Sequence, residues 1–229
     1  MPQNDVMILS CARDAEITNL LVRGIHRFWP EVRPRVVMDT DRATETELPD
    51  DIRTVIRERL PYLRKFFDLP LLAESETVYI LDADCLLYRH PRDFGPRAFQ
   101  GTYGGPDLPA GLDLWREMGV EIDSRNMRFC SGVFSAGKEM WTEGREAGIE
   151  WVRRCIAKGY DKVKYPGVVC EQSLVAGLWR QRYPNNPLPP GKYPYQRYVN
   201  GCTLWHISSG DYQELRETQA MISAYKALI

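Results

Sequence analysis

The stretch TVYILDADCLLYR, Thr77 to Arg89, decides how the rest of the chain is interpreted. It starts with β-forming residues, runs into two aspartates, Asp82 and Asp84, and then becomes apolar again. So apolar a strand is typical of the middle of a sheet, where an isolated carboxylate is costly to bury. Carboxylates two residues apart also project from one side of an extended chain and repel each other. A divalent cation bound between Asp82 and Asp84 would compensate both the cost of burial and the repulsion. The alternative to a metal site is that one aspartate caps a turn and the other is solvated.

Length and composition favour one soluble α/β domain. The chain has 229 residues, of which 44% are hydrophobic and 27% charged, as in an ordinary globular protein. The formal net charge of −1 does not call for a nucleic-acid partner, although it is compatible with a locally basic groove. Oligomeric state is not readable from these numbers.

The cysteines and the N-terminal stretch favour a reducing, cytoplasmic location. Six cysteines occur without a C-x-x-C pair, so neither zinc-finger spacing nor a disulfide-rich scaffold is indicated. The stretch MPQNDVMILSCARDAE carries acids where a signal peptide has its basic region. No segment approaches the roughly 20 apolar residues of a membrane span, so membrane contact is expected at most as peripheral association through a C-terminal helix.

The order of predicted elements indicates a parallel α/β start. A strand is expected over Val6 to Ser10, a helix from about Asp14 to Pro30 with Asp14 as N-cap, and a second strand that ends on Asp39 and Asp41. Apolar residues at helical spacing predict a helix over 60–72, just before the strand that carries Asp82. Further along, the pattern predicts a Gly/Pro loop over 100–113, a strand within 128–138, helices over 139–158 and 168–181, a strand within 202–208 and a C-terminal helix.

His206 is the candidate third metal ligand. It lies in LWHISSGD, at the end of the last predicted strand, and imidazole combines with carboxylates in Mn²⁺ sites. In open α/β sheets ligands bind beyond the carboxyl ends of the strands, where Asp82 and Asp84 also fall. The ordinary alternative for a single histidine beside Trp205 is a packed, hydrogen-bonded core residue.

Several segments together resemble GT-A glycosyltransferases of family 8, the type that includes glycogenin and bacterial lipopolysaccharide galactosyltransferases. The segments occur in the family's order along nearly the whole chain: YLRKFFDLPLL, YILDADCLLYRHP with the D-x-D motif, CSGVFSAGK, CEQSLVAGL, NPLPPGKYPYQRYVN and WHISSGD. The resemblance implies a single GT-A (Rossmann-like) domain over 1–229 with a mixed, mostly parallel central sheet. Residues 1–90 would form the nucleotide-binding half, and residues 91–229 the acceptor- and sugar-binding half.

The implied activity is that of a metal-dependent hexosyltransferase. The donor would be a UDP-sugar, UDP-glucose or UDP-galactose, used with Mn²⁺ (or Mg²⁺) and with retention of anomeric configuration. The acceptor hydroxyl stays open among lipopolysaccharide, a protein tyrosine, a capsule polymer and modified nucleobases in DNA.

Site residues follow from the same resemblance. Asp84 would coordinate the metal directly with His206, while Asp82 would be shared between metal, water and ribose. Lys65 would contact the donor, with Arg64 as the nearest alternative and a surface lysine as the ordinary explanation. The remaining predicted contacts are Gln172 at the reactive face, Glu171 and Asp107 at the donor hydroxyls, and Ala12, Arg13 and Asp39 at the base and ribose.

This sequence departs from the family pattern at several positions. Cys130 stands where asparagine is usual, and Glu171 replaces an aspartate. The spacing from His206 to Gly210 is one residue longer than the family's, and the K-P-W that follows in the family is missing. These departures bear on the donor and on the sugar contacts more than on the fold.

Two other functions compete with the glycosyltransferase. A haloacid-dehalogenase-type phosphohydrolase would use Asp82 as nucleophile and Asp84 as general acid. The nucleophile strand of that family normally opens the fold, whereas two predicted strands precede this one. The threonine or valine that usually follows the glycine after the pair is also absent, since Cys85 and Leu86 follow Asp84. A sugar-nucleotide-binding module without activity is the other alternative, and it is favoured by the missing lysine and asparagine.

Overall fold

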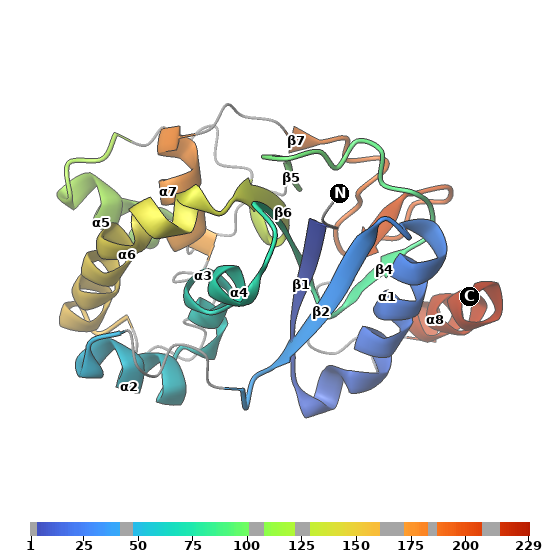
Figure 1. Cartoon of the computed structure of the whole chain (residues 1–229), viewed down its shortest axis with the longest axis horizontal. Helices are drawn as coiled ribbons and strands as arrows, with labels where there is room; N and C mark the ends of the chain where they lie inside the picture. Colours follow the sequence, from blue (N-terminus) through green and yellow to red (C-terminus); the bar gives the residue numbers. More distant parts are fainter. Residues whose placement is uncertain are drawn as a thin grey trace.

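The computed structural model describes residues 4–41, 48–100, 108–121, 129–160, 172–182, 187–207 and 216–229. Its centre is a six-stranded sheet in the order β2-β1-β3-β6-β5-β7, with helices on both sides (Figure 1). The strands are β1 (Asn4–Ser10), β2 (Val32–Met38), β3 (Thr77–Asp82), β5 (Phe99–Gln100), β6 (Cys130–Gly137) and β7 (Pro187–Leu188). Only β6 runs against the other five, so the predicted mixed, mostly parallel sheet is confirmed.

The parallel pairing of the first three strands brings their carboxyl ends to one edge of the sheet. β1 pairs with β2 through Ser10↔Met38 and with β3 through Leu9↔Asp82. The backbone N–H of Asp39 donates to the Ser10 carbonyl at 2.8 Å, which prolongs the pairing beyond the strand ends. The segments that follow β1, β2 and β3 therefore all leave the sheet at the same edge.

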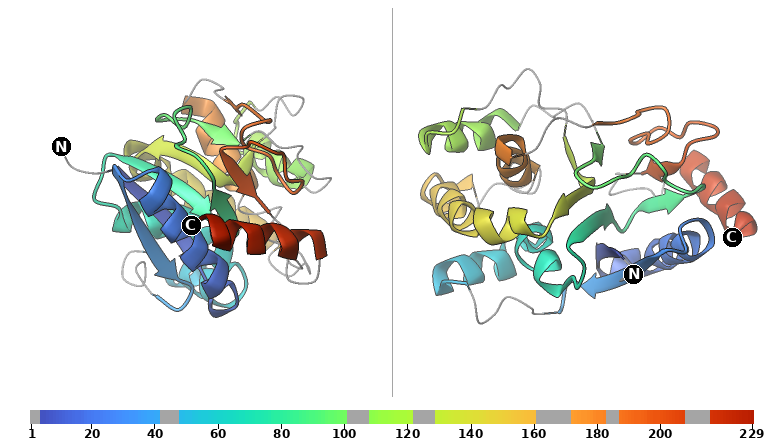
Figure 2. Two further views of the ribbon diagram at one scale, coloured as in Figure 1. Left: turned by 90° about the vertical axis from the view of Figure 1, so that its right-hand side faces the viewer. Right: turned by 45° about the horizontal axis from the view of Figure 1, so that its top comes forward.

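A second, two-stranded sheet joins distant parts of the chain. β4 (Cys85–Leu87) follows the two aspartates directly and pairs antiparallel with β8 (Leu204–His206) in the register Cys85↔His206. The C-terminal helix α8 (Arg216–Leu228) lies beside α1 (Ala15–Phe28) and β4, as the views in Figure 2 show. The buried Tyr225 hydroxyl donates to the Leu87 carbonyl at 2.6 Å and so holds α8 against β4.

Apolar side chains fill both faces of the sheet. One core cluster packs the helices of one side against β3 and β6 and includes Phe66, Trp115, Phe134 and Trp151. These helices are α2 (Asp50–Glu58), α3 (Arg64–Phe67), α4 (Leu69–Leu72), α5 (Leu108–Glu117), α6 (Glu139–Ala157) and α7 (Ser173–Arg182). A second cluster packs α1 against β1 and β3, and a third lies under α8.

One buried acid stabilises the start of the sheet. Asp5 is fully buried, and its carboxylate accepts hydrogen bonds from the backbone N–H groups of Glu74 and Ser75 at 2.5 and 3.0 Å and from Arg33 Nε at 2.8 Å. Burial alone would raise the pKa of Asp5, but these donors outweigh it and lower the pKa below its usual value.

Three predictions about elements were wrong. The helix expected over 60–72 is broken into a 3₁₀ turn (Pro61–Leu63), α3 and α4, because Pro70 lacks the N–H that a continuous helix requires. Within the loop predicted over 100–113, Gln100 belongs to β5 and α5 begins at Leu108 and buries Leu112, while residues 101–107 lie outside the described residues. Asp14 precedes α1, but its side chain makes no capping hydrogen bond and accepts instead from Cys11 Sγ at 3.2 Å.

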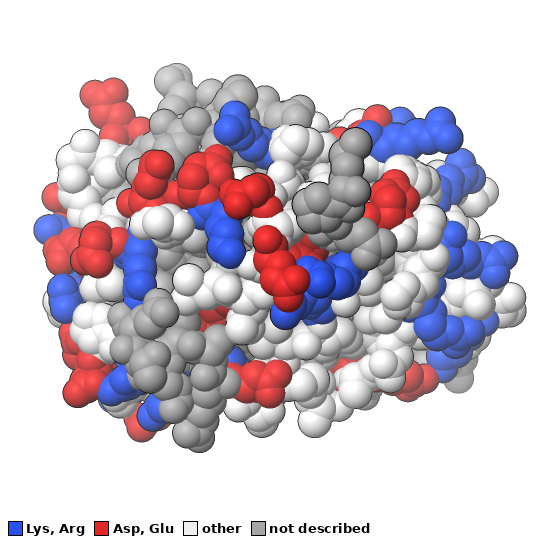
Figure 3. All heavy atoms as spheres, in the orientation of Figure 1, with Lys and Arg blue, Asp and Glu red and all other residues white. Residues whose placement is uncertain are grey.

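Charges of both signs are interspersed over the face in Figure 3, in keeping with the net charge of −1. Lys and Arg side chains gather at the side where α1 and α8 lie, and these helices carry the exposed Arg23, Arg27 and Lys226. Within the described part of the chain, no helix combines the length and the apolar character needed to cross a membrane.

Candidate functional site

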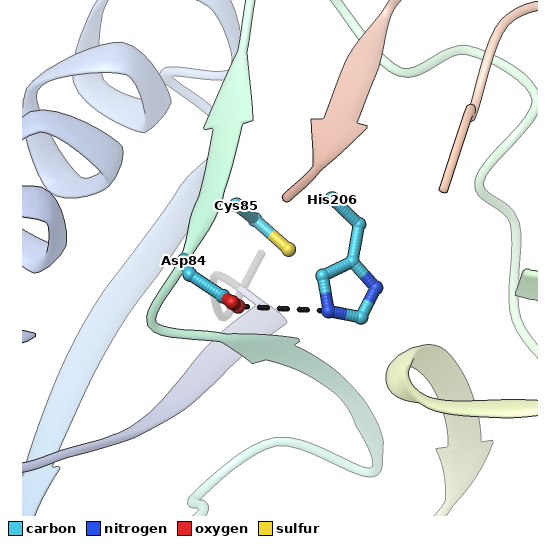
Figure 4. Close-up of side chains that lie close together, drawn as sticks. All are labelled: Asp84, Cys85 and His206. Carbon is cyan, nitrogen blue, oxygen red and sulfur yellow. Dashed lines mark ion pairs between the residues drawn. The ribbon is translucent and has the colours of Figure 1, made fainter. Parts of the chain in front are cut away.

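The fold brings the two aspartates and the histidine together. Asp82 is the last residue of β3, Asp84 lies in the turn to β4, and His206 ends β8, next to β4. His206 Nε2 lies 3.4 Å from Asp82 Oδ2 and 3.5 Å from Asp84 Oδ1. Figure 4 shows the Asp84 carboxylate, in the turn before β4, and the imidazole ring, at the end of β8, pointing toward each other. The aspartates keep about a fifth of their side-chain surface exposed, so a ligand can reach them, whereas His206 is buried.

Lys65 completes the charge balance of this cluster. Its ammonium forms an ion pair with Asp82 Oδ1, and its side chain is 9% exposed. Burial alone would raise the pKa of Asp82, but the charge of Lys65 and the facing His206 lower it strongly. Asp82 is therefore ionised at neutral pH, and the ammonium group lies at the aspartate pair instead of in solvent.

A buried glutamine fixes the orientation of His206. The side-chain amide nitrogen of Gln100 donates to the carbonyls of Tyr193 and Pro194 at 2.9 and 3.0 Å, so its oxygen must face the other way. That oxygen lies 2.9 Å from His206 Nδ1, which is therefore the protonated nitrogen of the ring. The lone pair of the neutral ring is then on Nε2, toward the aspartates.

The aspartates also act on the charge of this ring. Burial opposes protonation of His206, but the nearby sulfur atoms of Cys130 and Cys85, together with the carboxylates of Asp82 and Asp84 that face Nε2, outweigh burial and raise the pKa of the imidazole.

Gly132 of β6 leaves space at the same point. A Cβ at this position would lie 2.2 Å from Asp82 Oδ2 and 2.4 Å from His206 Cε1, far inside normal contact distance. Two carboxylates, one imidazole nitrogen with its lone pair directed at them, and a backbone without a side chain form a donor set that fits Mn²⁺ or Mg²⁺. The residues present therefore fit the ion that the sequence predicts.

The residues predicted to contact the nucleoside lie at the same edge of the sheet. Ala12 and Arg13 form an exposed 3₁₀ turn (Ala12–Asp14) after β1, and Asp39 is exposed directly after β2. The backbone bond between Asp39 and Ser10 holds these two segments together, one strand away from Asp82. The Arg13 side chain pairs with Asp14 at 3.1 Å.

Arg64, the alternative to Lys65, has a structural position. Its guanidinium pairs with Asp68 at 2.6 Å and donates to the carbonyls of Met38 and Asp39. It thereby anchors the end of β2, and Lys65 is the residue of the two that faces the aspartates.

The three residues predicted at the sugar are only partly described. Gln172 is half-buried immediately before α7, and no hydrogen bond or ion pair links it to the aspartates within the described part of the chain. Glu171 and Asp107 lie outside the described residues.

Gln100, Gly132 and Cys85 belong to the site although sequence reasoning did not assign them to it. Cys85 lies opposite His206 in the β4–β8 ladder, and donor atoms of Asp84, Cys85 and His206 all lie within 4.8 Å of one another. Nothing in the sequence near Gln100 indicates a site, whereas Gly132 lies in CSGVFSAGK, a segment that resembles the family although no role was assigned to this glycine. Cys85 offered one signal, since a potential metal ligand directly follows the aspartate pair.

No protein-family model and no curated protein matches the chain. Solved glycosyltransferase structures are nevertheless similar to it over almost its whole length. The apo form of glycosyltransferase GlyE from Streptococcus pneumoniae TIGR4 has a TM-score of 0.58 at 12% identity, over 98% of this chain and 60% of GlyE. The galactosyltransferase LgtC with donor and acceptor sugar analogues has a TM-score of 0.59 at 13% identity, over 98% of this chain and 94% of LgtC. The structure of an active-site mutant of LgtC has a TM-score of 0.59 at 11% identity.

At these identities the similarity shows the fold. The chain spans 60% of the length of GlyE and 94% of the length of LgtC. The mixed sheet with helices on both faces and the aspartate pair at the end of β3 lie within this shared fold. The protein therefore has the GT-A fold of the glycosyltransferases LgtC and GlyE.

Proposed function

We propose that this protein is a metal-dependent hexosyltransferase that uses a nucleoside-diphosphate sugar, UDP-glucose or UDP-galactose, and transfers the hexose to a hydroxyl acceptor with retention of configuration. The observation that carries this proposal is the convergence of Asp82, Asp84 and His206 at the open edge of a GT-A sheet. These three residues would hold Mn²⁺ or Mg²⁺. The ion, when bound, would stabilise the negative charge that develops on the diphosphate leaving group.

Lys65 is the residue of this chain best placed to add positive charge at the diphosphate. The family lysine after His206 is missing from the sequence, and the Lys65 ammonium already lies at Asp82. A diphosphate bound at the aspartates would share this ammonium, which would then stabilise charge at both groups. The ammonium group of Lys65 would thus replace the positive charge of the family lysine that is missing after His206.

The ends of β1 and β2 would bind the nucleoside. Ala12, Arg13 and Asp39 are exposed side by side at the edge that carries Asp82, and a carboxylate such as that of Asp39 is a common acceptor for ribose hydroxyls.

Gln172 would lie at the reactive face of the sugar, with Glu171 and Asp107 as acceptors for its hydroxyls. The LgtC active-site mutant replaces a glutamine by glutamate, which supports an active-site role for a glutamine in this fold. Cys130, which stands in place of the family's asparagine, lies with its sulfur 3.4 Å from His206 Nδ1. It therefore contacts the histidine and is buried, so the sugar hydroxyls need another partner.

Neither alternative function gains support from a specific contact. The strand with Asp82 is the third of the chain and lies in a fold shared with glycosyltransferases, which does not favour the phosphohydrolase. The binding module without activity differs from the enzyme only in turnover. None of the five cysteines in the described part of the chain forms a disulfide, which supports the cytoplasmic location that we propose.

Thermal unfolding with Mn²⁺, with UDP and with both tests the proposal. A ligand at a hundred times its dissociation constant adds about 2.7 kcal/mol to the free energy of unfolding. We expect UDP to raise the melting temperature only when Mn²⁺ is present, and Asp84→Asn to lose this effect. Asp113→Asn, the same substitution on an exposed residue of α5, is the matched control and should keep it.

Turnover is measured separately, as release of UDP from UDP-glucose and UDP-galactose with Mn²⁺. UDP release identifies the enzyme, whereas binding without release identifies the inactive module. A protein whose melting temperature responds to no nucleoside diphosphate, and which responds to phosphate mimics instead, would contradict the glycosyltransferase and support the phosphohydrolase.

A further inference from the structure

A sulfur atom lies at the metal centre, next to the oxygen and nitrogen donors. Cys85 is fully buried and directly opposite His206 in the β4–β8 ladder, so both side chains project to the same face. Donor atoms of Asp84, Cys85 and His206 lie within 4.8 Å of one another. Figure 4 shows the Cys85 sulfur on the side of the ring whose nitrogen faces Asp84.

The chemistry of these donors differs from that of a pure magnesium or manganese site. Carboxylates and water suit Mg²⁺ and Mn²⁺, whereas thiolate is a soft ligand that selects ions such as Zn²⁺. Imidazole nitrogen suits both kinds of ion, so His206 does not discriminate between them. Cys85 is therefore the residue that could change which ion the centre prefers.

A bound ion could use Cys85 without moving a strand. Asp84 and Cys85 are adjacent in the chain, and the Cys85↔His206 pair fixes the distance between the two strands. Oδ1 of Asp82 already forms an ion pair with Lys65. The donor atoms of Asp84, Cys85 and His206 form the group that could bind an ion without breaking this ion pair. Coordination would replace the S–H bond by a sulfur–metal bond and release the proton to solvent.

We propose that Cys85 is a ligand for thiophilic divalent ions, so that Asp84, Cys85 and His206 form a mixed oxygen, nitrogen and sulfur site for Zn²⁺ or Co²⁺ at the centre where Mn²⁺ would support transfer. This inference rests on the metal centre of the proposed function and adds a specificity-determining residue to it. The opposing explanation is that Cys85 is a small apolar side chain that fills the space between β4 and β8.

Cobalt spectroscopy on the full chain distinguishes these explanations without measuring activity. The metal-free protein is titrated with Co²⁺, and the near-ultraviolet absorption is recorded. Coordination by thiolate gives an intense sulfur-to-cobalt charge-transfer band, which oxygen and nitrogen ligands do not give. We expect the band in the wild type and its loss in Cys85→Ser, whereas Cys155→Ser and Cys202→Ser, at buried cysteines elsewhere, should retain it.

Competition between ions gives a second readout. Cys85→Ser should weaken Zn²⁺ binding by about tenfold or more, because the soft ligand is lost, and should change Mn²⁺ binding by less than about threefold. Cys85→Ala, which leaves no polar atom in the buried position, replaces the serine variant if that variant does not fold. Thermal unfolding of the metal-free variants shows whether the fold is intact.

Three results would overturn the inference. The first is Co²⁺ bound by the wild type without a charge-transfer band. The second is a band that survives Cys85→Ser and disappears in Cys130→Ser, which would assign the sulfur to the other thiol near His206. The third is an equal loss of Zn²⁺ and Mn²⁺ affinity in Cys85→Ser, the pattern of a packing defect.

The failure of the inference is distinguishable from that of the proposed function. A protein that binds UDP in a Mn²⁺-dependent manner and shows no sulfur-to-cobalt band keeps its proposed function and loses only the role of Cys85. A protein that binds neither Co²⁺ nor Mn²⁺, with or without UDP, loses both.

Discussion

Replacing Gly132 by alanine is the sharpest test of the candidate metal centre. The backbone of β6 passes so close to the centre that a Cβ at position 132 would lie 2.2 Å from Asp82 Oδ2 and 2.4 Å from His206 Cε1. Real Cβ atoms essentially never approach other heavy atoms within 3.0 Å, so the carboxylate must yield by about 0.8 Å and the ring by about 0.6 Å. Gly132→Ala therefore displaces two proposed ligands and removes none.

The two displacements predict a large effect on the site and a moderate effect on stability. A misplacement of about 1 Å in a catalytic arrangement costs about a hundredfold, so we expect Mn²⁺ affinity and the rate of UDP-sugar turnover to fall by about that factor. One extra methyl group in a packed interior costs about 1–3 kcal/mol of unfolding free energy. Since Lys65 holds the other oxygen of Asp82, the carboxylate cannot turn away without losing this ion pair.

Isothermal titration with Mn²⁺ and thermal unfolding of the metal-free protein measure the two effects separately. Gly95→Ala is the matched control, because a Cβ at Gly95 meets no atom within 4 Å, and it should behave as the wild type does. Wild-type Mn²⁺ affinity in a folded Gly132→Ala variant would refute the reasoning, because Asp82 and His206 could not then both be ligands at the positions observed.

Three further predictions concern the surroundings of the site. Gln100→Met removes the acceptor that orients His206, and loss of such a partner should lower the Mn²⁺ affinity in a titration by about 10- to 100-fold. Gln219→Met, the same substitution at an exposed position of α8, should leave the Mn²⁺ affinity unchanged. Asp5→Asn should lower the free energy of unfolding by about 1.5–3 kcal/mol at pH 7, measured by denaturant titration. Because the folded-state pKa of Asp5 is lowered, the difference in stability between wild type and variant should decrease as the pH falls below about 4. A difference that does not depend on pH would contradict the role of the charge of Asp5. Tyr225→Phe removes the hydroxyl that donates to the Leu87 carbonyl of β4, and it should lower the free energy of unfolding in denaturant titrations by about 1–3 kcal/mol. The same substitution at the exposed Tyr62 should leave the free energy of unfolding nearly unchanged.

The sequence was sufficient for the elements whose patterns are local. The apolar runs and turn signals located β1, α1, β2, β3 and α6 within a few residues. The signal was clearest for β1 and β3, which are buried along most of their length, whereas β2 buries only Val32 and Val37 and was recognisable by its β-forming residues. The helix α2 was not predicted from the sequence, because it is only nine residues long and is stabilised by packing Ile52, Val55 and Ile56 into the core. So short a helix is marginal by itself, and its sequence signal is correspondingly weak.

For the site, chemistry could be predicted and geometry could not. The aspartate pair at the end of a buried strand and the histidine at the end of a late strand were recognisable by residue type and position. The contacts of Gln100 and Gly132 depend on the pairing of β6 with β3 and on the loop that carries Tyr193, and neither is encoded near these residues. Lys65 could be distinguished from Arg64 only in three dimensions, since adjacent residues of a short helix point in different directions.

The β4–β8 pair has a consequence for folding kinetics. Asp84 and His206 are 122 positions apart in the chain, and they meet only when this two-stranded sheet closes. Closing so long a loop lowers the conformational entropy of the chain before the contacts between β4 and β8 can stabilise it. We therefore expect the site to form late in folding, after the more local pairing of β1 with β2. An ion held across β4 and β8 would then stabilise contacts that are absent from the folding transition state. It should slow the unfolding of the protein while leaving its folding rate almost unchanged.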